Sequence, residues 1–150
     1  FYTPYRQLIR EVIRPQFDEP IIYQRIPNLR VQLAENVAVG EFHRDRDYGH
    51  SPNEVNFILA LTDVWDSNAI WIESVEGKKD FAPINLRVGQ IAQTDSANCR
   101  HGNKLNTTGK SRVSIDFRII PLSRYEDSDK KSINMNMGFV IGEYFERLEE

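Results

Sequence analysis

Two histidines and one aspartate in this sequence have the residue types and spacing of metal ligands. His43 and Asp45 lie one residue apart, directly after the run Val37–Phe42, and His101 follows 58 residues after His43. On an extended backbone the side chains at i and i+2 point to the same side, so an imidazole and a carboxylate can meet at one point. With a second imidazole they would form a two-histidine, one-carboxylate site that leaves three positions of an octahedral Fe(II) ion open. Taken alone, however, a His-x-Asp pair in a loop rich in Arg and Asp is more often a solvated turn.

A second group with possible chemistry lies on the predicted strand 111–120. Its residues alternate, with a polar row on one face and an apolar row on the other. The polar row could be the solvent face of an edge strand. It could instead face a cavity, where an Arg fork with a hydroxyl two residues away would bind a carboxylate. The polar row is Arg112, Ser114, Asp116 and Arg118, and the apolar row is Val113, Ile115, Phe117 and Ile119.

The elements that must position these residues follow from the hydrophobic periodicity. Thr3-Pro4 is typical of a helix start, and Tyr5, Leu8, Ile9, Val12 and Ile13 form an amphipathic stripe that Pro15 should end. If the polar row of strand 111–120 faces a cavity, this helix could cover its apolar row. About seven to eight short strands then favour a sandwich, jelly roll or small barrel. We predict strands at 29–33, 37–42, 55–61, 69–73, 81–86, 90–94 and 111–120, and an edge strand at 139–141.

Length and composition limit the function classes. The chain has 150 residues, enough for one domain, and a net charge of −3 with no polybasic run, so we do not expect nucleic-acid binding. The lone Cys99 suits a reducing compartment, and no apolar stretch reaches the ~20 residues of a membrane span. We therefore expect a cytoplasmic protein. Because the chain starts at Phe1 without a methionine or a signal-peptide pattern, we also expect a trimmed or partial N-terminus.

Taken in order, His43-x-Asp45, His101 and Arg112-x-Ser114 resemble the pattern of the Fe(II)- and 2-oxoglutarate-dependent oxygenases. Four segments, at 47–63, 68–74, 98–106 and 111–121, are similar to the small-molecule subgroup near phytanoyl-CoA dioxygenase-like and streptomycin-biosynthesis oxygenase-like proteins. The resemblance covers about residues 29–121. It implies a mainly β fold, a double-stranded β-helix (jelly roll, cupin-like), with the N-terminal amphipathic helix packed on the sheet, in a single domain over residues 1–150.

The resemblance also assigns roles. The chain would be a dioxygenase that hydroxylates a small metabolite, using O2 and releasing succinate and CO2, with ascorbate as a reductant. The polar residues of the predicted entrance make a polar metabolite the expected one; they are Asp116, Arg118, Asn98, Arg100 and Asn103. A carboxylate at Asp45 fills the position that halogenating relatives leave open for chloride, so hydroxylation is expected rather than halogenation. Fe(II) would be bound by His43, Asp45 and His101, and 2-oxoglutarate by Arg112 and Ser114 with a further contact from Asn56.

Other interpretations stay open at this stage. His50 is more typical of a loop or substrate contact than of a ligand, Cys99 of a small, half-buried residue, and Glu41 and Asp47 of supporting positions at most. Asp116 and Arg118 either line the entrance of a cavity or pair with each other. The function could also be that of a cupin-like metal enzyme that does not use 2-oxoglutarate, or of a non-catalytic β-sandwich binding module. We expect a small-molecule substrate and no membrane partner, and the oligomeric state is not indicated.

Overall fold

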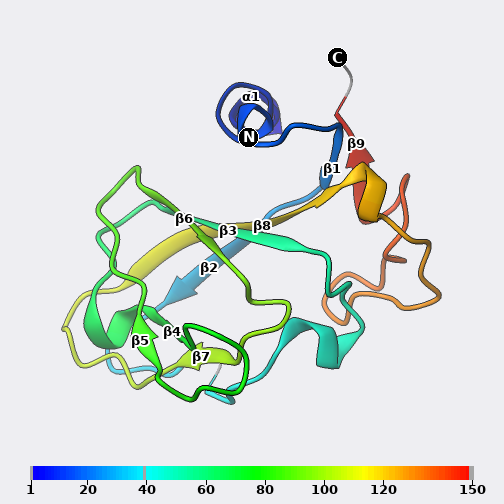
Figure 1. The fold of residues 1–150 in the computed structure, drawn as a ribbon. Helices are drawn as coiled ribbons and strands as arrows, with labels where there is room; N and C mark the ends of the chain where they lie inside the picture. The colour runs from blue at the N-terminus through cyan, green and yellow to red at the C-terminus, as the bar shows by residue number, and fades with distance from the viewer. Residues whose placement is uncertain (1, 39, 149–150) are drawn as a thin grey trace.

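The computed structural model describes residues 2–38 and 40–148, and it confirms a mainly β chain with one N-terminal helix (Figure 1). The larger of two sheets has the strand order β6-β3-β8-β1-β9, with β2 also paired to β8, and the smaller sheet has the order β5-β4-β7. Both sheets are built from antiparallel pairs. The strands are β1 (Ile21–Gln24), β2 (Asn28–Gln32), β3 (Val55–Ala60), β4 (Ile70–Ile72), β5 (Ala82–Pro83), β6 (Ile91–Thr94), β7 (His101–Asn103), β8 (Arg112–Pro121) and β9 (Phe145–Arg147).

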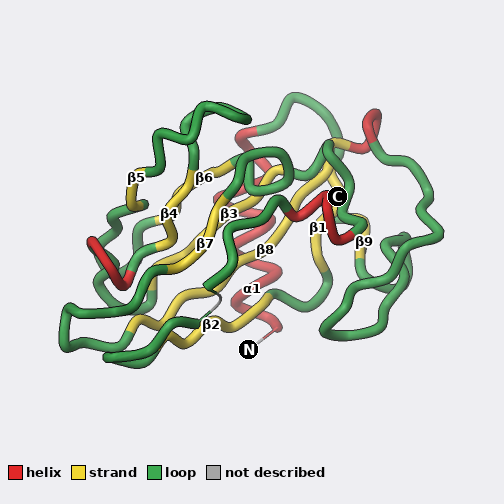
Figure 2. The backbone as a smooth tube through the Cα atoms, turned by 90° about the horizontal axis from the view of Figure 1, so that it is seen from below, coloured by secondary structure: helices red, strands yellow, loops and turns green. Residues whose placement is uncertain are grey.

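The elements form three layers. The helix α1 (Tyr2–Leu8) lies over one face of the larger sheet, and the smaller sheet lies on the opposite side (Figure 1). Seen from below, the helix lies behind the strands of the larger sheet (Figure 2). Short 3-10 turns at Asp45–Tyr48, Asp66–Asn68 and Leu122–Arg124 connect the strands. The space between the two sheets is therefore the place where a cavity can form.

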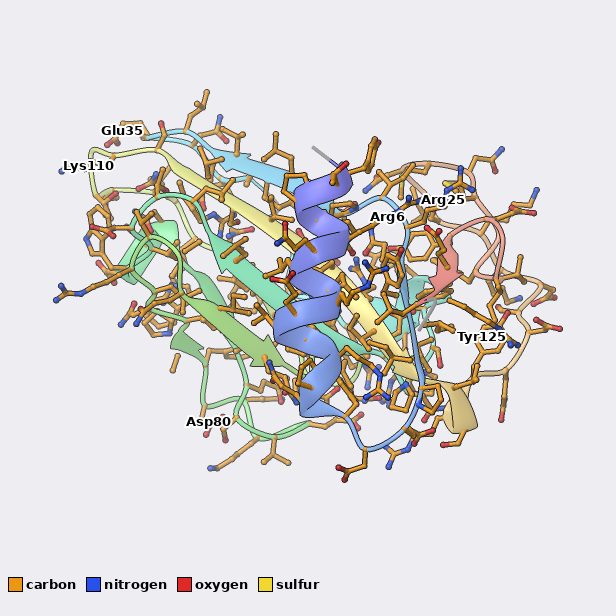
Figure 3. The ribbon with its side chains drawn as sticks, turned by 90° about the horizontal axis from the view of Figure 1, so that it is seen from above. Arg6, Arg25, Glu35, Asp80, Lys110 and Tyr125 are labelled. Atoms are coloured by element: carbon orange, nitrogen blue, oxygen red, sulfur yellow. The ribbon has the colours of Figure 1, made fainter. Side chains whose placement is uncertain are left out.

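The N-terminal helix covers the apolar face of β8, as the amphipathic pattern predicted. Seen from above, it lies across the strands, with Arg6 on the side of β9, where Arg6 pairs with Glu146 at 3.1 Å (Figure 3). The helix continues past Leu8 as a π-helical turn at Ile9–Ile13 and a 3-10 turn at Arg14–Gln16, so it ends one residue after Pro15. Val12, expected on the apolar stripe, is 46% exposed. Three helix side chains lie in one core cluster with Phe57, Ile115, Phe117 and Ile119, and these are Tyr5, Ile9 and Ile13.

The strand β8 is the centre of the larger sheet and pairs with β1, β2 and β3. Its apolar row packs under the helix, and its polar row faces the smaller sheet. Arg112 and Ser114 are buried, at 2% and 1% exposure. The interpretation of the polar row as a solvent-exposed edge is therefore wrong, because the strand is central and both of its faces are covered.

The predicted strand at 37–42 is not formed by its described residues, and Val39 lies outside the described residues. The chain pairs with β7 at one point, where His43 and His101 form an isolated antiparallel bridge. Phe42 lies on the bare backbone of Gly102, where an added Cβ would be 2.8 Å from the Phe42 ring. Beside β7 this part of the chain therefore forms one bridge, at His43, and not the predicted strand.

Several other strands differ from the prediction. The segment 81–86 forms only the two-residue β5, and 139–141 forms no strand, whereas β9 at Phe145–Arg147 is the edge strand. The strands β1, β7 and β9 were not predicted. In β1 every residue is buried, so the alternation that identifies a strand is missing. Over residues 2–38 and 40–148, no helix is both long and apolar enough to cross a membrane.

Candidate metal centre

His43, Asp45 and His101 meet at one point between the two sheets. One ligand atom from each residue lies within 4.8 Å of the other two. The Nε2 atoms of His43 and His101 are 3.6 Å and 3.3 Å from Oδ1 of Asp45, and the two imidazole rings have centroids 4.6 Å apart. Three donor atoms this close, two nitrogens and one carboxylate oxygen, fit one divalent first-row metal ion and leave the far side of that ion open.

The backbone orients both imidazoles for this task. Nδ1 of His43 lies 2.9 Å from the carbonyl oxygen of Glu41, and Nδ1 of His101 lies 3.1 Å from that of Cys99. A carbonyl only accepts, so each Nδ1 carries the proton and each Nε2 keeps its lone pair toward the centre. Such a hydrogen bond behind the ring is the usual partner of a metal-binding histidine. Glu41 thus supports the site through its main chain, not through its carboxylate.

Asp45 is the first residue of a 3-10 turn that Gly49 ends in the left-handed region, at φ +90°. Its backbone N–H donates to the carbonyl of Ser96 at 3.0 Å, which places the turn beside the strand that leads to His101. The carboxylate is 6% exposed. Its Oδ2 accepts from Arg118 Nη2 at 2.7 Å and from Asn56 Nδ2 at 3.3 Å. The other oxygen, Oδ1, is therefore the atom that is left for a metal.

The charge state of the group matches a cation site. Burial alone would raise the pKa of Asp45, but the charge of Arg118 and the hydrogen bonds with His101 and His43 outweigh it and hold the pKa well below its usual range. The hydrogen bond to Asp45 raises the pKa of His43, against burial, which lowers it. The Asp45 carboxylate is thus ionised at neutral pH, and its negative charge favours a positive charge at His43. A metal ion can supply that positive charge in place of a proton.

Arg118 is the buried support of this centre, a role that the sequence did not reveal. It is 6% exposed, and besides Asp45 it donates through Nη1 to Gln24 Oε1 at 3.1 Å and to Tyr144 Oη at 3.2 Å. Its Nε lies 3.2 Å from Glu54 Oε2 but without hydrogen-bond geometry. No sequence signal could have found this network, because Gln24 and Tyr144 come from β1 and from the segment before β9, far away in the chain.

The contacts of the neighbouring Asp116 bear on whether Asp116 and Arg118 line a cavity or pair with each other. It lies 3.5 Å from Arg118, but its main partners are Arg30, whose Nε donates at 2.7 Å, and Asn28, whose Nδ2 donates at 2.9 Å. Asp116 and Arg118 therefore form only a weak pair with each other. Asp116 and Arg118 both line the cavity, and Arg118 in addition binds Asp45.

Arg112 and Ser114 lie in the same region with unused hydrogen-bonding groups. Among the described residues, Arg112 Nε, Arg112 Nη1 and Ser114 Oγ are buried without a hydrogen-bond partner. Burial lowers the pKa of Arg112 to about 10, with the positive charge of Arg30 adding to this effect and Asp116 opposing it. A buried, unpaired guanidinium is costly unless a ligand completes it. Arg112 lines a cavity of about 460 Å³ that also contains His43, Asp45, His101 and Asn56.

Asn56 lines this cavity, but both ends of its amide already have partners. Nδ2 donates to Asp45, and Oδ1 accepts from the N–H of Ala97 at 3.2 Å. Its observed contacts thus support Asp45 directly.

The remaining candidates lie outside the ligand group. His50 pairs with the buried Glu54 at 3.0 Å and packs on Phe139, which agrees with a loop or substrate contact. The i, i+4 spacing of His50 and Glu54 is a signal that sequence reasoning could have used. Cys99 is buried rather than half-buried, at 4% exposure, and Asp47 pairs with Arg44 at 2.9 Å.

Comparisons with known proteins show what the chain and its fold are similar to. No protein-family model matches the chain. The streptomycin biosynthesis protein StrG of Streptomyces griseus is 44% identical over 142 residues, which are 95% of this chain and 67% of StrG. The non-heme monooxygenase ThoJ, solved with nickel, has a TM-score of 0.60 at 17% identity over 75% of this chain and 49% of its own. HygX from Streptomyces hygroscopicus, solved with nickel, 2-oxoglutarate and hygromycin B bound, has a TM-score of 0.56 at 12% identity over 88% and 70% of the two chains.

A further match is SnoN, a non-heme alpha-ketoglutarate-dependent epimerase from nogalamycin biosynthesis, with a TM-score of 0.54 at 17% identity over 87% of this chain and 64% of its own. These likenesses define a class: the chain has the fold found in non-heme oxygenases and epimerases. With nearly half of its residues identical to StrG, the chain belongs to the StrG family. It spans about half the length of ThoJ and two thirds of that of StrG.

Proposed function

We propose that this chain is an Fe(II)- and 2-oxoglutarate-dependent dioxygenase that hydroxylates a small polar metabolite and releases succinate and CO2. One observation carries the proposal: a buried Arg112 guanidinium, without a hydrogen-bond partner among the described residues, lies in the same cavity as a His-Asp-His group. A cupin-like enzyme without 2-oxoglutarate would leave that guanidinium unexplained.

His43, Asp45 and His101 would hold the iron. Two imidazoles with Nε2 directed inward and one carboxylate oxygen fit Fe(II) and leave positions for a bidentate cosubstrate and for dioxygen. When bound, Fe(II) supplies the activation of O2 that couples decarboxylation of 2-oxoglutarate to oxidation of a substrate C–H bond. Because Asp45 is a carboxylate ligand, no position is left for chloride, so we propose hydroxylation and not halogenation.

Arg112 and Ser114 would bind the distal carboxylate of 2-oxoglutarate. The guanidinium can donate through Nε and Nη1, and the hydroxyl of Ser114 two residues along β8 can add a third hydrogen bond. This would satisfy the unpartnered donors of both residues, Arg112 Nε, Arg112 Nη1 and Ser114 Oγ. Asn56 would border the cosubstrate, although its observed contacts position Asp45.

The wider assignment follows from the same site. We propose that the two sheets form a double-stranded β-helix, in one domain over residues 1–150, as in the jelly roll that the ligand order implies. The substrate class is supported by StrG, named for streptomycin biosynthesis, and by HygX, whose structure holds hygromycin B, which suggests a natural-product intermediate. The reduced, buried Cys99 suits a cytoplasmic enzyme.

The direct test is release of succinate from 2-oxoglutarate in the presence of Fe(II), O2 and ascorbate. Slow release without any substrate is expected. His101→Ala, which removes one iron ligand, should abolish it. If 2-oxoglutarate does not bind to the metal-loaded protein, the proposal is wrong and the cupin-like alternative is favoured.

Binding of 2-oxoglutarate should depend on Arg112 much more than on Ser114. Arg112→Ala should weaken the binding by about 2–5 kcal/mol, because a desolvated charge-assisted fork is lost, and Ser114→Ala by about 1 kcal/mol. Calorimetric titration of the Ni(II)-loaded protein measures both values. Arg87→Ala, at an exposed arginine away from the cavity, is the matched control. Unchanged affinity in Arg112→Ala would refute the role of this residue.

A further inference from the structure

We propose that a second, smaller cavity beside the metal ligands binds the primary substrate, and that this substrate is a hydroxyl-rich molecule of about one ring without a positive charge. The proposal rests on the proposed function, because it requires 2-oxoglutarate to occupy the larger cavity.

Two cavities meet at the candidate metal centre. The larger one, of about 460 Å³, contains Arg112 and His101, and the smaller one, of about 210 Å³, contains neither. His43 and Asp45 line both cavities. With the cosubstrate held at Arg112, the metal would still be reached from the smaller cavity, on the side of His43 and Asp45.

The size of the smaller cavity limits its ligand. Pockets for drug-sized ligands usually measure about 300–1,000 Å³. A volume of about 210 Å³ is below that range. It therefore suits a single sugar-like ring, or one ring of a larger molecule whose remainder extends into solvent.

The charges around the smaller cavity argue against a cationic ligand. Asp45 is the one carboxylate among the described lining residues, with Oδ2 bound to Arg118 and Oδ1 directed to the metal position. The two acidic groups behind the wall are also occupied. Glu54 pairs with His50, and Asp116 accepts from Arg30. An ammonium group in this cavity would lose its hydration without gaining a free carboxylate, which is unfavourable.

The other lining groups favour hydroxyls. Arg30 lines both cavities, and it bonds to Asp116 only through Nε, so its two terminal nitrogens have no hydrogen bond to the described residues. Tyr48, at 44% exposure, stands at the rim with its ring 5.2 Å from that of His43. A hydroxyl oxygen can accept from Arg30 and the O–H group can donate to an amide oxygen, while the C–H face of a ring can pack on apolar side chains. The further groups of the wall are Asn28, His50, Arg118, Ser132, Ile133, Asn134, Met135 and Tyr144.

The charge class can be tested with matched probes. The protein loaded with Fe(II) and 2-oxoglutarate, kept free of oxygen, is titrated with D-glucose and myo-inositol, and in parallel with D-glucosamine and spermidine. The visible absorption of the iron complex reports occupancy next to the metal. D-glucose should bind at least tenfold more tightly than D-glucosamine, which differs from it by one amine. Equal or tighter binding of either amine, or no binding of both hydroxyl probes at millimolar concentration, would overturn the proposal.

The position of the site can be tested with two tryptophan variants. Asn134→Trp places a large ring in the smaller cavity and should weaken D-glucose binding at least tenfold, with 2-oxoglutarate affinity within twofold of the original. Asp129→Trp, at a side chain that is 86% exposed and lines neither cavity, should change neither affinity. Unchanged D-glucose binding in Asn134→Trp would show that the cavity is wrongly assigned.

A protein that binds 2-oxoglutarate but prefers amines overturns this inference alone, whereas failure to bind 2-oxoglutarate overturns the proposed function as well.

Discussion

Arg118 is the residue through which the candidate metal centre depends on the interior of the larger sheet. Its Nη2 fixes Oδ2 of Asp45 at 2.7 Å, so Oδ1 is presented to the metal in one orientation. Loss of a hydrogen-bond partner behind a metal ligand typically costs 10–100-fold in metal affinity. Arg118→Met should therefore weaken Ni(II) binding by about that factor, measured by competition with a chelator of known affinity.

A milder variant separates this effect from a general loss of folding. Arg118→Lys keeps one buried positive charge beside Asp45 but loses the planar fork. It should retain the fold, as judged by circular dichroism, and show an intermediate metal affinity. Ni(II) affinity equal to that of the original chain in both folded variants would contradict the positioning role.

The depressed pKa of Asp45 predicts a pH dependence of stability. A carboxylate whose pKa is lower in the folded state contributes stability that is fully present above its unfolded pKa, about 3.9, and is lost as the pH falls through the folded value. The free energy of unfolding of the metal-free protein should therefore decrease below about pH 4. In Asp45→Asn the slope in this acid range should be smaller, although the variant is less stable at pH 7 because Arg118 loses the charged oxygen that accepts from its Nη2. Urea titrations at pH 7 and pH 3 measure the slopes, and equal slopes would contradict the assignment.

Residue patterns could predict the candidate ligands but not the residues that hold them in place. His43, Asp45, His101 and Arg112 were predictable because their order and their strand-end spacing recur in one enzyme class. The partners of Arg118 were not, since alternation along β8 tells which face a side chain occupies but not which distant strand lies opposite. A single sequence shows the same alternation whether an arginine on that face is buried or exposed to solvent.

Among the elements, the N-terminal helix is the one whose contribution can be measured most simply. Ile9 is fully buried against the core of the larger sheet, whereas Val12, three residues on, is 46% exposed. Ile9→Ala should lower the free energy of unfolding by about 2–5 kcal/mol, as expected for a large-to-small core substitution, and Val12→Ala by less than about 0.5 kcal/mol. Denaturant unfolding gives both numbers, and similar losses in the two variants would mean that the helix does not cover β8 as described.

The elements also differ in how well the sequence predicts them. The strands β3 and β8 have six and ten residues, long enough for an apolar run or an alternation to be recognised. By contrast, β7 and β9 have three residues each and are formed only because a partner strand is present. The segment at 37–42 has a strand-like composition, yet Phe42 packs onto Gly102, a tertiary contact that overrides local preference.

For the whole molecule, a metal that binds only the folded state should raise its stability. At a free Ni(II) concentration of about 100 times the dissociation constant, the gain should be about 2.7 kcal/mol. Thermal unfolding with and without Ni(II) measures this as a higher midpoint. His101→Ala should remove most of the gain. A midpoint that does not depend on Ni(II) would mean that the three ligand side chains do not form a metal site.

The position of β8 at the centre of the larger sheet also has a consequence for how the chain is made. Its pairing partner β1 is translated about 100 residues earlier, and at about 5–20 residues per second the delay is roughly 5–20 s. During this time Ile21, Ile22 and Tyr23, all buried in the finished sheet, have no strand beside them. The N-terminal helix likewise has no β8 to cover. We therefore expect the nascent chain to need chaperone protection until Pro121 has left the ribosome, and its yield to be sensitive to chaperone supply.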